Sequence, residues 1–233
     1  MRRIRKKETP LHLINWIDEF RIRCGAEPSY DDLAQSEEYG KLKKELLAEQ
    51  GYICCYCEKE VGVRAGDGSN IEHFMPRHPD KRVLTPEECA ICQSAELDYE
   101  NMFVSCGGEE RYSEDHCNNT KNNWFDFHNC ISPASEKIDG LFGFRLNGKI
   151  FAVDNNVCAE KMRENLNLDS YALRKQRETA YDTVLEEEFS DDTLLQDDEY
   201  IMETIDMYQE KDKNGRYEPF CSMITYCLRE YLL

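Results

Sequence analysis

The sequence contains no apolar run near the roughly 18 residues that a membrane-spanning helix needs, so no membrane span is predicted. Residues 1–7 are basic, but Glu8, Thr9 and Pro10 follow them where a signal peptide would carry its apolar stretch. We therefore expect no signal peptide and a cytoplasmic protein. No P-loop of the GxxxxGK[ST] pattern occurs, so any nucleotide sensing is expected to lie elsewhere.

Basic residues are also scarce, since Lys and Arg number 29 against 47 Asp and Glu, which gives a net charge of −18. Such a surface repels phosphate backbones unless its bases are concentrated near a binding site. Acids crowd together between Asp182 and Asp212, where Lys211 is the only base. Two interpretations of this acidic stretch are open. Either a basic partner or a larger assembly covers it, or the stretch forms a helical surface exposed to solvent. Residues 1–7 are either a phosphate-binding arm or, by default, a frayed cationic terminus.

The length of 233 residues allows one sizeable core, or a small core with an appended helical lobe. Hydrophobic residues make up 40% of the chain, which is ordinary for a globular protein and excludes wholesale disorder. The chain has twelve cysteines. In a reducing compartment we expect them to be metal ligands and buried thiols instead of disulfides.

The spacing of apolar residues and of turn residues predicts the secondary structure. Helices are expected from Leu11 to Phe20, ended by Gly25 and Pro28, and from Ser29 to Gly51. Strands are expected at 52–54, 61–63, 71–73 and 102–104, with a loop at 65–69, an irregular segment after Pro76 and a polar insert at 107–115. Further expectations are a helix from Cys117 through Phe127, a hairpin at 141–153 with Asn147-Gly148 at its tip, helices after Asp169, a turn at 212–215 and a last helix at 220–232.

These elements predict an α+β fold in three segments. Residues 1–50 form an N-terminal helical segment, residues 51–132 a central zinc-stabilised core, and residues 133–233 a β-hairpin with a helical C-terminal lobe.

Four cysteines have spacings that predict a structural zinc site. Cys54 and Cys57 place two thiolates on one tight turn, and Cys106 and Cys117 supply a second pair at the end of a strand and the start of a helix. Cys89-x-x-Cys92 is a competing pair with closer spacing. We favour the first quartet because its zinc would tie two active-site elements together. The remaining cysteines are expected to be buried thiols: Cys24, Cys55, Cys130, Cys158, Cys221 and Cys227.

Four polar residues between these cysteines indicate catalysis. His73, at the end of a strand, can take a proton from water at neutral pH. Glu72 and Asn118 can offer oxygen ligands to Mg²⁺ or another divalent ion, which would polarise a phosphate. Asn101 is expected to fix the ring of His73 through a hydrogen bond.

Basic and aromatic side chains lie near this set in the sequence. Arg77 and Lys121 are expected to contact phosphates of a nucleic acid, with Lys81 and Arg82 equally explained as solvated surface. Trp124, Phe125 and Phe127 are expected in the core, and His12, His78 and His128 are given no catalytic role.

The order of these residues resembles the HNH endonucleases, whose ββα-metal fold is held by a CxxC…CxxC zinc site. The matching pieces are Cys54 to Glu58, Ile71 to Arg77, Asn101, Cys106, and Cys117 to Lys121. The resemblance implies His73 as general base, Glu72 and Asn118 as ligands of the catalytic metal, and Asn101 as the residue that positions the base. This chain departs from the family in having Asn118 in place of a histidine, and in its split second cysteine pair. The split leaves His116 as an alternative ligand of either metal.

The C-terminal half resembles a narrower group, the PtuB nucleases of the Septu anti-phage systems, found also with some retrons. The matching segments are Glu164 to Asp169, Leu173-Arg174 with Arg177, and Arg216 to Cys221. This resemblance implies an antiviral defence nuclease that acts on DNA in a hetero-oligomeric complex with an ABC-type ATPase of the PtuA kind. Such a partner would also explain the acidic surface.

Two other functions remain open. The chain could be a zinc-ribbon module that binds partners without catalysis, or an RNA-cutting toxin nuclease. An assay of the His73→Ala protein separates catalysis from partner binding, and parallel assays on DNA and RNA separate the two nucleases.

Overall fold

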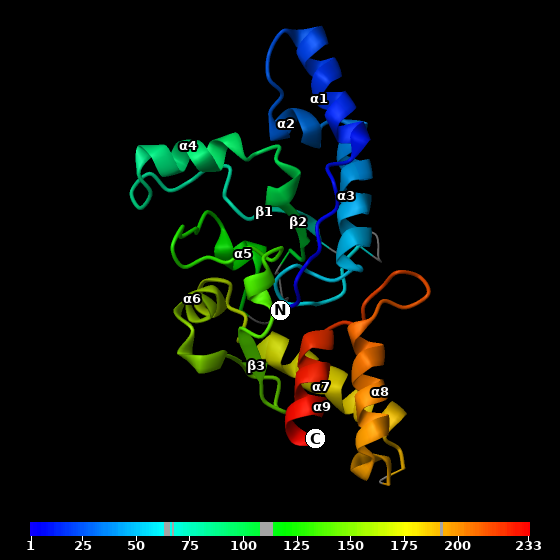
Figure 1. Ribbon diagram of the computed structural model, residues 1–233. Coiled ribbons are helices and arrows are strands. Elements are labelled where there is room, and N and C mark those ends of the chain that lie inside the picture. The colour runs from blue at the N-terminus through cyan, green and yellow to red at the C-terminus, as the bar shows by residue number, and fades with distance from the viewer. Residues whose placement is uncertain (63–65, 67, 108–113, 192) are drawn as a thin grey trace.

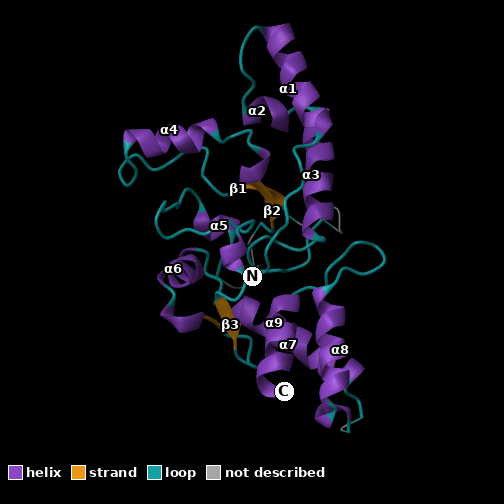
Figure 2. Cartoon of the chain, in the orientation of Figure 1, coloured by secondary structure: helices purple, strands orange, loops and turns teal. Residues whose placement is uncertain are grey.

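The computed structural model describes residues 1–62, 66, 68–107, 114–191 and 193–233. The fold is a mixed α+β arrangement of helices around two small antiparallel sheets (Figures 1 and 2). The α-helices are α1 (Leu11–Cys24), α2 (Tyr30–Ala34), α3 (Glu37–Gln50), α4 (Pro86–Ser94), α5 (Asn118–Lys121), α6 (Val157–Asn165), α7 (Tyr171–Glu188), α8 (Asp198–Gln209) and α9 (Cys221–Tyr231). The strands are β1 (Asn70–His73), β2 (Met102–Ser105), β3 (Phe142–Phe144) and β4 (Ile150–Ala152). Four short 3₁₀ helices are η1 (Tyr99–Asn101), η2 (Glu136–Ile138), η3 (Val153–Asn155) and η4 (Leu194–Gln196).

The N-terminal helices agree only in part with the sequence. Helix α1 is confirmed and ends at Gly25, whose φ of 65° is the left-handed conformation that glycine adopts without strain. The single helix expected from Ser29 to Gly51 is wrong, because α2 and α3 are separate. The Ser36 hydroxyl accepts a hydrogen bond from the Glu38 N–H and starts α3 anew.

Residues 1–7 are packed against the rest of the chain, so the frayed terminus expected by default for them is wrong. Met1 and Ile4 are buried, and the Ile4 N–H donates to the Pro133 carbonyl at 2.8 Å. Figure 1 shows this segment running from the middle of the molecule up to α1.

Strands β1 and β2 form the central sheet and confirm the strands expected at 71–73 and 102–104. They pair antiparallel, with Glu72 opposite Phe103 and His73 opposite Met102. The strand pair expected around the Cys54 turn is reduced to one bridge between Ile53 and Glu60. Parts of the expected strand 61–63, the loop 65–69 and the insert 107–115 lie outside the described residues.

Two helices in the central segment differ from expectation. The region after Pro76 contains α4, which the sequence analysis missed, and Thr85 caps α4 by accepting from the Glu88 N–H. The helix expected from Cys117 through Phe127 ends at Lys121 as α5, because Asn122 takes a φ of 48°.

The C-terminal part follows the sequence closely. Strands β3 and β4 form the expected hairpin, and Gly148 at its tip lies so close to α7 that an added Cβ would overlap the Arg174 carbonyl. Ser170 caps α7 by accepting from the Leu173 N–H. Helix α9 is apolar on one face and packs against α7, α8 and β3.

One continuous core of buried side chains runs through the described residues. It includes Leu42 of α3, Phe103 of β2 and Ile224 of α9, so all three predicted segments contribute to it. The boundaries at 50 and 132 remain a prediction. Within the described residues no helix has both the length and the apolar character to cross a membrane.

Candidate metal centre and adjacent groove

Four buried cysteines meet at one point, as the spacing predicted. The Sγ atoms of Cys54, Cys57, Cys106 and Cys117 all lie within 4.8 Å of one another. Cys54 and Cys117 are 3.9 Å apart at sulfur, and Cys57 and Cys106 are 3.7 Å apart. These separations are close to the edge of a tetrahedron of zinc–thiolate bonds about 2.3 Å long. The cluster could therefore hold a metal such as zinc.

The protonation of these thiols fits a metal site. Burial alone would raise the pKa of Cys57, but hydrogen bonds from Cys106 and Cys117 bring it down to about 7. Burial and hydrogen bonds to the other thiols raise the pKa of Cys117. A soft cation that prefers thiolates would displace the protons of these thiols on binding.

The competing cysteine pair stands apart from this cluster. Cys89 and Cys92 are buried on α4, and neither joins a metal-ligand group among the described residues. His116 is fully buried, with its Nδ1 3.2 Å from the Cys117 sulfur and 3.9 Å from the Cys106 sulfur. Its imidazole therefore lies against the thiolate cluster.

The C-terminal lobe holds the last cysteine in place. Cys117 has a φ of 53°, an uncommon conformation for a residue with a side chain, and its N–H donates to the Leu166 carbonyl at 2.8 Å. Asn167 donates to the Asp115 carbonyl at 2.8 Å. Residues 164–169, which the sequence analysis singled out, therefore fix the position of the chain where it enters α5.

A groove of about 370 Å³ lies beside the metal centre and collects three of the predicted catalytic residues. Glu72 and His73 reach it from the end of β1, and Asn118 reaches it from the first position of α5. The groove is also lined by residues that the sequence analysis did not name as site residues: Tyr30, Ile71, Pro76, Asn119, Asn122 and Asn123. Glu72, His73 and Asn118 therefore line one groove, with Glu72 and His73 largely buried at its wall.

His73 is held by a backbone carbonyl. Its Nε2 lies 2.9 Å from the Glu96 carbonyl oxygen, which can only accept, so Nε2 donates and the lone pair is left on Nδ1. The ring also packs edge-on against Tyr30 at 4.4 Å between centroids. Burial, together with the positive charges of Arg77 and Lys121, lowers the pKa of His73 to about 4. The imidazole is therefore neutral at pH 7.

Glu72 and Lys121 form a buried ion pair, which corrects one prediction. The Lys121 Nζ lies 2.7 Å from Glu72 Oε1, and Tyr56 donates to the same oxygen at 3.0 Å. Lys121 also donates to the His73 carbonyl at 2.9 Å, and its side chain is only 3% exposed. Its ammonium group is thus engaged by Glu72 and the His73 carbonyl, and Lys121 lines a neighbouring cavity instead of the groove where the phosphate contact was expected.

The hydrogen bonds of the Asn101 side chain go to other groups than the ring of His73, so the hydrogen bond expected between these two residues is not formed. The Asn101 side chain donates to the Met75 and Ala95 carbonyls, each at 3.0 Å, and accepts from the Met75 N–H at 2.7 Å. Asn101 therefore joins the chain leaving β1 to the end of α4. It acts on His73 only through the backbone around it.

The remaining predicted residues lie in the groove and around a neighbouring cavity. Arg77 lines the groove, bonded to Asp31 at 2.8 Å and stacked over Tyr30. Lys81, Arg82 and Trp124 line a neighbouring cavity of about 480 Å³ that shares His78, Asn122 and Asn123 with the groove. The rings of Phe125 and Phe127 pack edge-to-face with one another.

Sequence reasoning missed Tyr56 and Glu96. No sequence motif indicates that Tyr56, which lies between two cysteines, donates a hydrogen bond to Glu72. Glu96 contributes a backbone carbonyl, which any residue could supply, so no sequence signal exists for it.

No family model matches the chain, and no curated protein matches it.

Proposed function

We propose that this chain is a metal-dependent endonuclease of the HNH type, which hydrolyses the phosphodiester bonds of DNA. The observation that carries the proposal is the meeting of Glu72, His73 and Asn118 in one groove beside a four-cysteine cluster. The order of elements supports it, because two antiparallel strands are followed by a helix that starts directly after a cysteine of that cluster.

His73 acts as the general base. Because Nε2 donates to the Glu96 carbonyl, Nδ1 is the nitrogen that can accept a proton from the attacking water. The neutral state of the ring at pH 7 keeps that lone pair available. The guanidinium of Arg77, on the groove wall, orients a phosphate next to the bond that is cut.

Glu72 and Asn118 would hold the catalytic divalent cation. They offer one carboxylate and one amide oxygen, a set that suits Mg²⁺ because this ion keeps several of its waters. When bound, the cation would supply positive charge opposite the phosphate oxygens. Lys121 already pairs with Glu72, so the carboxylate would be shared between an ammonium group and the cation.

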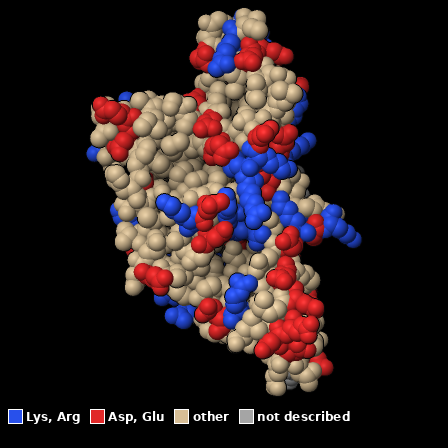
Figure 3. Space-filling view, in the orientation of Figure 1, with Lys and Arg blue, Asp and Glu red and all other residues tan. Residues whose placement is uncertain are grey.

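The defence role is part of the same proposal. An ABC-type ATPase of the PtuA kind is the proposed partner, in a cytoplasmic complex, and the resemblance of residues 164–169 and 216–221 to PtuB nucleases supports it. The acidic residues of α8, which crowd one end of the face in Figure 3, offer a surface for such a partner.

The test is a nuclease assay on the purified chain and on its native complex, with and without a chelator. We expect cutting that chelator abolishes, and a loss of at least about 100-fold in His73→Ala, the usual size of a general base's contribution. His128→Ala is the matched control, because His128 is exposed and lies outside the groove. Equal cutting by His73→Ala and the parent protein would contradict the proposal. Parallel DNA and RNA substrates identify the nucleic acid.

A further inference from the structure

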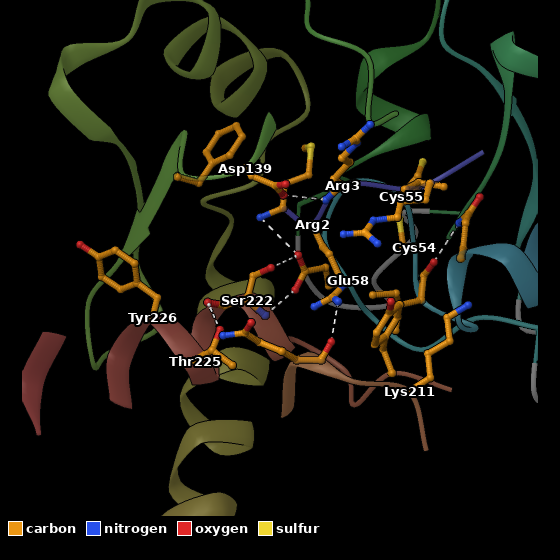
Figure 4. Close-up of a pocket in the computed structure, with 18 of the residues that line it drawn as sticks. Arg2, Arg3, Cys54, Cys55, Glu58, Asp139, Lys211, Ser222, Thr225 and Tyr226 are labelled. Atoms are coloured by element: carbon orange, nitrogen blue, oxygen red, sulfur yellow. Dashed lines mark hydrogen bonds and ion pairs between the residues drawn. The ribbon is translucent and has the colours of Figure 1, made fainter. Parts of the chain in front are cut away.

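A second cavity, of about 600 Å³, lies between the N-terminal segment, the turn at 211–217 and helix α9 (Figure 4). Cys54 and Cys55 line it, so it reaches the turn that carries the first metal-site cysteines. Its lining shares no residue with the groove of Glu72 and His73. The volume is in the range of pockets that hold a small organic ligand.

The basic N-terminal segment is fixed across this cavity. Arg2 donates to the Gln209 carbonyl and stacks over the Tyr217 ring at 3.9 Å. The backbone N–H of Arg3 donates to Asp139 at 3.2 Å. These contacts tie the N-terminal segment to three other parts of the chain, so the segment is in place before any ligand binds.

The buried carboxylates of the cavity are already occupied. Glu58 receives the amino group of Met1 at 3.3 Å and two hydrogen bonds from Ser222, as Figure 4 shows. Glu49 pairs with Lys6 at 2.9 Å and accepts from the backbone N–H of Lys7 at 2.6 Å. The other two acids of the lining are Asp139, which accepts from Arg3, and Glu210, which is exposed.

Several cations remain uncompensated. In the described parts of the chain, no carboxylate lies within ion-pair distance of the side chains of Arg5, Lys7 and Arg229, all of which line the cavity. Burial lowers the pKa of Lys211, and the nearby positive charges of Lys7 and Arg2 lower it further. Lys and Arg gather over the middle of the face in Figure 3, where Figure 1 places this segment. In a chain of net charge −18, this local concentration of exposed cations favours the approach of an anion.

We infer that this cavity is a binding site for a phosphate-bearing ligand of nucleotide size, held by Arg5, Lys7 and Arg229. Three separate cations around one space suit a group with several negative oxygens better than a single carboxylate. Tyr226 adds aromatic surface against which a base can lie. A free nucleotide and a short stretch of nucleic acid share this chemistry. The site does not depend on the chain being a nuclease.

The experiment measures binding by isothermal titration calorimetry on the full-length, metal-loaded protein. The probes are inorganic tripolyphosphate, ATP and a ten-nucleotide single-stranded DNA. We expect saturable binding of at least one probe with a Kd of about 1 mM or tighter. The triple variant Arg5→Gln, Lys7→Gln, Arg229→Gln should weaken it at least about tenfold.

The matched control is Arg23→Gln, Lys44→Gln, Lys213→Gln, which removes the same number of charges from exposed positions outside the cavity. It should bind as the parent protein does. Binding of tripolyphosphate and ATP identifies a free nucleotide as the source, and binding of the DNA alone identifies a nucleic-acid strand. The inference is overturned if no probe binds, or if both triple variants lose binding equally. Both results are read without any cutting assay, so they are independent of the proposed nuclease.

Discussion

At the scale of single residues, the contacts of the carboxylate oxygen Glu72 Oε1 limit how the groove can bind a cation. Lys121 and Tyr56 both bind it, inside a site where the carboxylate is 5% and the ammonium 3% exposed. A buried charge that loses its partner is costly, because the remaining group keeps its desolvation penalty. Removal of either partner therefore destabilises the fold, and the pair limits the charge that Glu72 can offer to a cation.

Lys121→Met tests this balance. We expect the free energy of unfolding to fall by about 3–5 kcal/mol in chelator, the cost typical of breaking a buried pair. Added Mg²⁺ should restore more stability to this variant than to the parent, because the carboxylate becomes free to bind the cation. Urea denaturation with and without Mg²⁺ measures both effects.

The control for this measurement is Lys41→Met, which breaks the exposed pair with Glu38. Its effect should stay within about 1 kcal/mol and be independent of Mg²⁺. If Lys121→Met responded to Mg²⁺ no more than Lys41→Met does, Glu72 would not be a cation ligand.

Single residues also show what the sequence can reveal. The zinc quartet was predictable because the residue type itself carries the chemistry, and two cysteine pairs flank recognisable elements. The role of Asn101 could not be predicted from the sequence, because its partners are the backbone carbonyls of Met75 and Ala95. Which carbonyl an amide meets depends on the path of the chain, and no residue type records it. The burial of Lys121 could not be predicted from the sequence for the same reason.

At the scale of elements, capping and turn residues indicated where helices and strands begin and end better than the spacing of apolar residues did. The apolar stripe across residues 29–51 continues through the break between α2 and α3, and only the cap at Ser36 marks it. Helix α4 begins with a capping box at Thr85 and Glu88 that was present in the sequence but was outweighed by the nearby prolines. By contrast, the Asn147-Gly148 turn and the Ser170 cap identified the hairpin and α7 correctly.

The turn after α5 offers a prediction on pH. Asp126 accepts from the N–H groups of His128 and Asn129 and pairs with Lys161 of α6 at 3.1 Å. Burial would raise the pKa of Asp126, but these donors lower it to about 2. Because the folded pKa lies below the usual value, the stabilisation is complete above about pH 4 and is lost as pH falls through 2.

Asp126→Asn should therefore be less stable than the parent by about 1–2 kcal/mol at pH 7. The difference should close as the pH falls toward 2, where the parent's carboxylate is protonated as well. Urea denaturation at several pH values measures it. Asp80→Asn is the control, because the pKa of Asp80 is also about 2 but its hydrogen bonds and ion pair with Arg82 are exposed. If Asp80→Asn lost as much stability at pH 7 as Asp126→Asn does, an exposed ion pair would stabilise the fold as well as the half-buried one, which would contradict the prediction.

At the scale of the whole molecule, the four-cysteine cluster joins segments that are distant in sequence. Cys54 and Cys57 precede β1, Cys106 follows β2, and Cys117 starts α5, where the C-terminal lobe holds it through Leu166. Metal binding would thus lock the groove, the central sheet and the lobe into one arrangement. Cys117 keeps its unfavourable φ because ligation and the bond to Leu166 determine its position together.

This arrangement predicts how the whole protein responds to loss of zinc. The purified chain should contain one zinc ion, and its removal by a strong chelator should lower Tm by at least about 10 °C, because structural zinc contributes many kcal/mol to folding. Cys57→Ser should lose the ion. Cys89→Ser/Cys92→Ser should keep it, although both thiols are buried, because α4 takes no part in the cluster. Metal analysis of the purified variants decides between the two pairs. If zinc left with Cys89 and Cys92 and stayed in Cys57→Ser, the metal would sit on α4, and the quartet could not be what brings Asn118 to Glu72 and His73.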